Sequence, residues 1–213
     1  MRVKRGFCVC WLIIVAAGAA QSAWGTTKGL NQIVTPDIQP KGVLTLSFQE
    51  QDTHIGNSNE LQWELGLTKR FEVAVFQGFS PPQTILNAEF GVVQKPPFLL
   101  SVGFLGWQNQ AVGGSGPEPF LEAGYYQGKD EWMAGVLHAG KQYQLILGWG
   151  YQTRPNLVIQ FDYLSGSGNF TTAGFTYNIT PSLQINPAVY LSNDSQHHCY
   201  GYTVLTWSVQ LWK

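Results

Sequence analysis

Apolar and polar residues alternate with a period of two over most of the chain beyond residue 40. In the stretch YQLILGWGY, residues 143–151, the odd-numbered positions carry aromatic residues at both ends and leucines between them, whereas the even-numbered positions carry Gln, Ile and Gly. Successive side chains of a β-strand point to opposite faces. The pattern therefore predicts a strand whose aliphatic band is flanked by aromatic residues, which is the order expected of a strand that faces lipid.

Breaks at Gly, Pro, Asn and Asp divide the alternation into about twelve strands of roughly ten residues each. No window sustains a helical period, and no later stretch has the length of a membrane helix. Residues 29–42, with Pro36 and Pro40, are expected to form a stiff lead-in to the first strand. The predicted fold is all-β: a closed antiparallel transmembrane β-barrel, because an even strand number is typical of such barrels and closure leaves no exposed edge. The expected strands cover 42–52, 59–70, 71–79, 84–94, 98–108, 118–128, 131–139, 142–152, 156–165, 169–179, 182–192 and 200–212.

The lengths of the joins between strands predict the orientation of this barrel. Outer-membrane barrels have short turns on the periplasmic side and longer loops outside. Joins from even to odd strands are short, including 153–155, where Pro155 and Asn156 favour a tight turn. Most of the other joins are longer, although those at 80–83 and 140–141 are short. The even-to-odd joins are therefore expected on the periplasmic side.

The N-terminus has the features of a secretory signal peptide. Three of the first six residues are basic, and an apolar run at 7–20 ends in small residues. This run is shorter than the roughly 20 residues that a membrane-spanning helix needs. We expect cleavage after Ala23 or Gly25, which gives a signal peptide over 1–25 and one outer-membrane β-barrel domain over 26–213.

The composition indicates that much of the protein surface is not exposed to water. Charged residues make up only 12% of the chain and aromatic residues 14%, and the charged share is about half of the usual value. The net charge of −1 argues against nucleic acid as a partner, because such binding depends on clustered Lys and Arg. Two of the three cysteines, Cys8 and Cys10, belong to the signal peptide, so only Cys199 remains and no disulfide framework is expected.

The faces opposite the apolar alternates collect Gln, Asn, Thr and several acids, whereas the bases of the barrel region fall in the joins. Carboxylates around an aqueous lumen favour cations. Alternatively, they pair with Lys and Arg that reach in from the rims, or they are protonated in a plugged interior. Three segments have apolar or small residues on both faces, so the sequence does not decide which face points to the lumen: 98–108, 131–139 and 169–179. The lumen-lining candidates are Glu64, Glu72, Glu89, Glu122, Asp162, Gln144 and Gln160.

The outer loops contain the only other candidate chemistry. The weak metal candidates are His54, His197, His198 and Cys199. Their spacing matches no recognised structural metal site, so we predict solvated loop residues, no metal and no cofactor. The stretch DTHIGNSNE places His54 and Ser58 close to acids, but it is a poor match to a hydrolytic triad, and no enzyme activity is predicted.

The chain resembles bacterial outer-membrane up-and-down β-barrels of the small, porin-like kind over nearly all of its mature length. The resemblance is carried by ELQWELGLTKRFEVAV, YQLILGWGYQTRPNLVIQFDYLSG and the aromatic last strand YGYTVLTWSVQLW, although Lys213 follows the terminal aromatic Trp212. It implies the bacterial outer membrane as location, lipid as surroundings, and a small channel or solute-binding barrel for small solutes or cations. The alternatives are a non-conducting structural or surface-interaction barrel and a secreted soluble β protein. The oligomeric state is left open.

Overall fold

The computed structural model describes residues 29–108 and 116–213. The predicted signal peptide, 1–25, lies outside the described residues. Within the described part, the chain forms twelve β-strands in the expected order. Their bounds are β1 Val43–Gln51, β2 Asn59–Gly66, β3 Phe71–Phe79, β4 Pro82–Lys95, β5 Phe98–Trp107, β6 Glu118–Gln127, β7 Asp130–Ala139, β8 Gln142–Arg154, β9 Leu157–Leu164, β10 Phe170–Thr180, β11 Leu183–Ser192 and β12 Cys199–Gln210.

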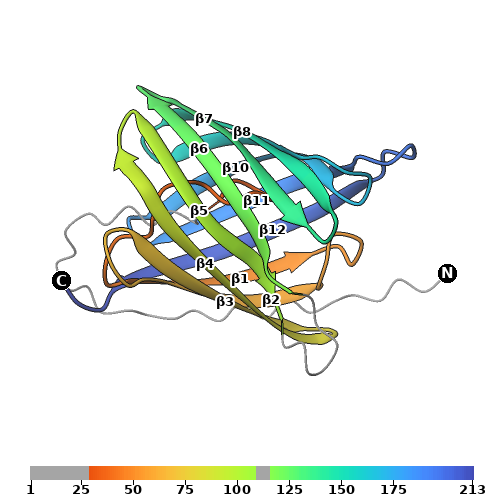
Figure 1. Cartoon of the computed structure of the whole chain (residues 1–213), viewed down its shortest axis with the longest axis horizontal. Coiled ribbons are helices and arrows are strands. Elements are labelled where there is room, and N and C mark those ends of the chain that lie inside the picture. Colours follow the sequence, from red (N-terminus) through yellow and green to blue (C-terminus); the bar gives the residue numbers. More distant parts are fainter. Residues whose placement is uncertain (1–28, 109–115) are drawn as a thin grey trace.

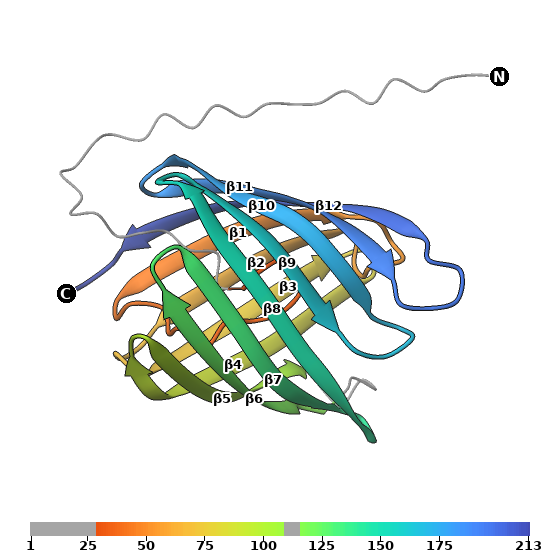
Figure 2. The ribbon, with the colours of Figure 1, turned by 90° about the horizontal axis from the view of Figure 1, so that it is seen from above.

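The strands close into one barrel, in which each strand is hydrogen-bonded to its neighbours in sequence (Figures 1 and 2). The ring is completed by antiparallel pairing of β1 with β12, from Val43 opposite Gln210 to Gln51 opposite Tyr202. Every strand therefore has two partners, and no sheet edge is left open. The prediction of a closed antiparallel barrel with twelve strands is confirmed. Among the described residues, no helix has the length and apolarity needed to cross a membrane.

The ends of the strands agree with the alternation pattern to within a few residues, with one larger difference. Strand β2 ends at Gly66, four residues before the predicted end. Beyond Gly66 the chain already turns, because the N–H groups of Leu67 and Thr68 both donate to the carbonyl of Phe71. The turn between β8 and β9 falls at Pro155 and Asn156, as predicted.

The two faces of the barrel differ in chemistry. Large apolar side chains are exposed on the outside of every strand except β2, for example Leu121 on β6, Leu147 on β8 and Phe161 on β9. The inner face is buried and rich in polar groups; Ser101 and Glu122 have no exposed surface. An apolar exterior around a polar interior is the arrangement of a barrel whose solvent is lipid.

Residues 29–41, here called the lumen segment, lie inside the barrel and not outside its first strand (Figure 1). The expectation of a simple lead-in at 29–42 is therefore incomplete: the segment is joined to β1, but it runs within the ring of strands. It forms no strand; its one ladder-type contact is an isolated bridge between Lys41 and Gly66. The lumen is thus occupied by the chain's own N-terminal part.

Candidate functional site

The predicted lumen residues all lie on strands of the barrel wall. Glu72, Glu89, Glu122, Gln160 and Asp162 are buried, whereas Glu64 on β2 and Gln144 on β8 are partly buried. Glu72 and Glu89 face each other directly across the pairing of β3 with β4. Acidic groups are thus distributed around the inner wall on β2, β3, β4, β6 and β9.

The seam between β1 and β12 carries inward polar residues that were not among the candidates. The hydroxyl oxygens of Thr45 and Ser208 are 3.0 Å apart, and those of Ser47 and Thr206 are 2.9 Å apart. Glu60 at the start of β2 is also buried, and one of its carboxylate oxygens accepts from Gln49 at 3.4 Å and from Gln62 at 3.5 Å. The period-two alternation in VLTLSFQEQ is the signal by which this row could have been found.

The tip of the lumen segment is bound to the polar wall formed by β9, β10 and β11. The backbone N–H groups of Asn31 and Gln32 donate to one carboxylate oxygen of Asp162, at 2.8 and 3.2 Å, and the Gln32 side chain donates to the other oxygen at 3.2 Å. The Asn31 amide donates to Thr172 on β10 at 2.9 Å, and the hydroxyl of Tyr190 on β11 donates to the Asn31 carbonyl. Asp162 is therefore the centre of this polar contact.

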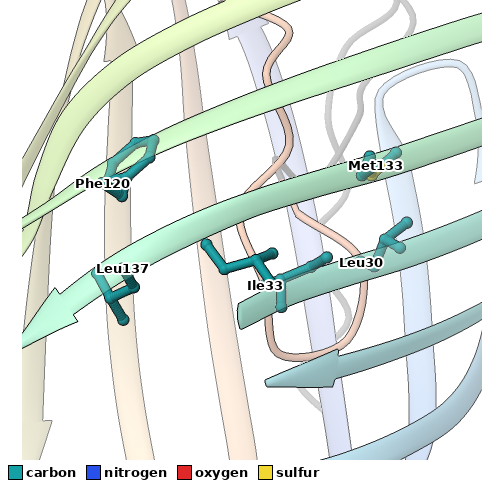
Figure 3. Close-up of a cluster of buried hydrophobic side chains, with 6 residues drawn as sticks. Leu30, Ile33, Phe120, Met133 and Leu137 are labelled. Carbon is teal, nitrogen blue, oxygen red and sulfur yellow. The ribbon is translucent and has the colours of Figure 1, made fainter. Parts of the chain in front are cut away.

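The same tip packs against an apolar patch on the wall formed by β6, β7 and β8. Leu30 and Ile33 form one buried cluster with side chains of this wall (Figure 3). The backbone closes a tight turn between them, because the N–H of Leu30 donates to the carbonyl of Ile33 at 3.0 Å. The wall members of the cluster are Phe120, Met133, Leu137 and Ile146.

Glycines in the wall make room for the lumen segment. A Cβ added at Gly148 on β8 would lie 2.6 Å from Ile33 Cδ1 and 2.7 Å from Leu30 Cδ1, and one added at Gly124 on β6 would lie 2.7 Å from Pro36 Cγ. Glycine inside a strand often marks the close approach of another part of the chain. The glycines at these wall positions therefore allow the lumen segment to pack closely against the strands.

The lower part of the segment is held by β3 and β4. The N–H of Gln39 donates to a carboxylate oxygen of Glu72 at 2.5 Å, and the side chain of Gln94 donates to the Pro36 carbonyl at 2.7 Å while accepting from the Ile38 N–H at 3.3 Å. The segment therefore touches the wall on β3, β4, β6, β7, β8, β9, β10 and β11, which together make up most of the ring.

The charged residues of the wall are separated by sign. Every lysine and arginine in the described part is exposed, and those of the barrel region lie at strand ends or in turns. The buried charged residues of the described part are all acids: Glu60, Glu72, Glu89, Glu122 and Asp162.

The outer loops do not assemble a reactive centre in the described part. His54 Nδ1 lies 2.6 Å from Asp52, and the ring of His54 stacks on Tyr200 at 4.9 Å. The His54 backbone N–H lowers the pKa of the Asp52 carboxyl. The Ser58 hydroxyl accepts from Asn59 at 3.2 Å. His197, His198 and the exposed Cys199 lie near the last outer loop, and the described residues contain no group of three ligands that could hold a metal ion.

Comparisons with known proteins define the class of fold. No protein-family profile matches the sequence, and no curated protein matches it. Among solved structures, the KdgM porin in complex with disordered oligogalacturonate matches with a TM-score of 0.56 at 12% identity, over 78% of this chain and 99% of that chain. A second structure of the KdgM porin gives a TM-score of 0.54 at 12% identity over the same shares of the two chains.

At this level of identity the likeness concerns the fold. Together with the apolar exterior, it shows that the chain is a porin-like transmembrane β-barrel of the bacterial outer-membrane type, as its sequence predicts.

Proposed function

We propose that this protein is an outer-membrane channel for small solutes, with a preference for cations. The observation that carries the proposal is the ring of inward polar and acidic side chains in a closed barrel whose described lysines and arginines are all exposed. A narrow lumen with carboxylate walls raises the local concentration of cations and lowers that of anions. The polar hydroxyl and amide groups between the acids provide hydrogen-bonding partners for neutral solutes.

The neighbouring porin indicates which solutes to compare. The KdgM porin is described in complex with oligogalacturonate, which is a polyanion. A wall that carries Glu60, Glu89 and Asp162 would repel such a molecule. We therefore expect small cations and small neutral solutes to pass in preference to acidic saccharides.

Reversal potentials in planar bilayers under a KCl gradient test this proposal. The wild-type chain should give discrete current steps with a reversal potential of the cation-selective sign. Glu60→Gln and Glu89→Gln should move that potential toward zero, because each removes a negative charge from the inner face. Glu50→Gln is the matched control, since Glu50 is exposed on β1. A reversal potential of zero or of the anion-selective sign in the wild type would contradict the preference for cations.

A non-conducting structural barrel is the second candidate, and one observation favours it: the lumen segment crosses the interior from Glu72 on β3 to Asp162 on β9, on opposite sides of the ring. The two candidates differ in what happens when the segment is removed. A channel conducts once its lumen is cleared, whereas a structural barrel whose inner side chains fill the lumen stays silent.

A further inference from the structure

We propose that the lumen segment, residues 29–41, is a releasable plug that limits conduction, and that Asp162 and the glycine-lined wall of β8 are the two contacts that hold its tip. This inference rests on the proposed function as a channel.

The barrel can keep its wall without the segment. The hydrogen-bonded ring is complete from Val43 onward, through the pairings of β1 with β2 and with β12. The segment is not a member of that ring, and it is attached mainly through side chains and through backbone N–H groups that donate to carboxylates. Elements without ladder hydrogen bonds open at lower free energy than the strands that surround them. Release of the segment is thus a local event that leaves the wall intact.

The contacts of the tip are divided between two adjacent parts of the wall, one apolar and one polar. On one side Leu30 and Ile33 pack on the apolar patch of β6, β7 and β8 (Figure 3). On the other side Asn31 and Gln32 donate three hydrogen bonds to the single carboxylate of Asp162. These two contacts lie side by side, because Gly148 and Asp162 are register partners on β8 and β9. The segment as a whole crosses the lumen, since Gln39 is bound to Glu72 on β3 and Asn31 to Asp162 on β9, six strands away in the ring of twelve. A solute on its way through therefore meets the segment.

The chemistry of the wall also favours one defined position of the lumen segment over nonspecific filling of the lumen. The apolar patch would be exposed in an otherwise polar lumen if the segment were absent, and burying apolar surface under Leu30 and Ile33 is favourable. Gly148 faces only flexible side-chain atoms within 3 Å, namely Leu30 Cδ1 and Ile33 Cδ1. A side chain added at this position would compete directly with the tip for the same space.

Two substitutions that act on different contacts of the tip, one polar and one apolar, should therefore have the same effect. Asp162→Ala removes the acceptor of the polar contact, and Gly148→Leu fills the space of Leu30 and Ile33. We expect both to raise single-channel conductance, or the open fraction, several-fold over the wild type in planar bilayers. Glu60→Ala separates loss of an inner carboxylate from release of the segment. It should move the reversal potential, as proposed above, without the several-fold rise in conductance, because Glu60 accepts from Gln49 and Gln62 and not from the segment.

Gly201→Leu is the control for an added side chain, because nothing lies within 4 Å of a Cβ at Gly201. Neither control should show the several-fold rise in conductance. Each variant is first checked for heat-modifiable electrophoretic mobility, which reports a closed barrel. If Gly148→Leu does not fold, a reversible cross-link provides the test in its place.

For the cross-link, Leu30→Cys and Gly148→Cys are combined in a Cys199→Ser background. A Cβ at Gly148 would lie 2.7 Å from Leu30 Cδ1, so the two thiols meet when the tip is in place. Oxidation should lower the conductance and reduction should restore it. Absence of a disulfide under oxidation, or a disulfide that leaves conduction unchanged, would overturn the inference.

The outcomes separate this inference from the proposed function. If the wild type and all release variants are silent, the protein is not a channel. If the wild type conducts and Asp162→Ala and Gly148→Leu have the same conductance, the proposed channel function is supported and the inference of a plug is wrong. Larger conductance in both Asp162→Ala and Gly148→Leu, without a rise in conductance in either control, supports both statements.

Discussion

A charge placed on the outer face tests whether lipid is the solvent of this barrel. Leu147 lies near the middle of β8 and is 41% exposed, and its register partners on the neighbouring strands are Ala134 and Tyr163. In a membrane, Leu147→Arg puts a guanidinium group near the bilayer midplane, which costs about 2–4 kcal/mol of folding free energy. In a water-soluble barrel the same change at a partly exposed position would stay within about 0.5 kcal/mol.

The control lies on the same face of the same strand. Tyr143, at the end of β8, is 79% exposed, and Tyr143→Arg near the interface should cost only about 0–1 kcal/mol. Refolding into lipid vesicles, followed by urea titration with tryptophan fluorescence as readout, gives both free energies of unfolding. A loss of 2 kcal/mol corresponds to about a thirtyfold shift in the folding equilibrium, which such titrations resolve. Equal stabilities of the two variants would refute the membrane-spanning assignment of this face.

Two further predictions concern the base of the lumen segment and the last outer loop. Gly66→Ala should destabilise the folded chain by about 1–3 kcal/mol, because the new Cβ would meet the backbone carbonyl oxygens of Gln39 and Pro40; urea titration measures this. In the loop, hydrogen bonds to Asp194, first from the backbone N–H of Gln196, lower the pKa of its carboxyl below the ordinary value of 3.8. The loop contact should therefore be complete above pH 3.8 and be lost as the pH falls through the lower folded value, and a carboxyl pKa at or above 3.8 in an NMR titration would contradict this.

The wall of the barrel could be predicted from sequence because its period-two pattern is local. Each strand has an apolar outer face, as at Leu147 and Phe161, and each join has residues that favour a turn, as at Pro155. Closure followed from the even strand number and the need to satisfy both edges. The end of β2 was misplaced because Gly66 is fixed by a distant contact with the carbonyl groups of the lumen segment, which alternation does not report.

The lumen segment could not be predicted from that pattern, since it has no period of its own. Its trace in the sequence is indirect. The segment 131–139 was ambiguous because both faces are apolar, and the structure shows the cause: Met133 and Leu137 face inward and pack on Leu30 and Ile33. Gly148, in the interior of the clearest strand, marks the same contact. An inward apolar patch beside an interior glycine that pairs with a buried acid therefore indicates that another part of the chain packs inside a polar lumen.

Planar-bilayer recording of the purified full chain, alongside Asp162→Ala, tests whether this barrel is a plugged cation channel. We predict discrete steps that reverse at a cation-selective potential in a KCl gradient, with several-fold larger conductance in Asp162→Ala than in the wild type. Silence of both proteins after verified insertion, or anion selectivity of the steps, would contradict it.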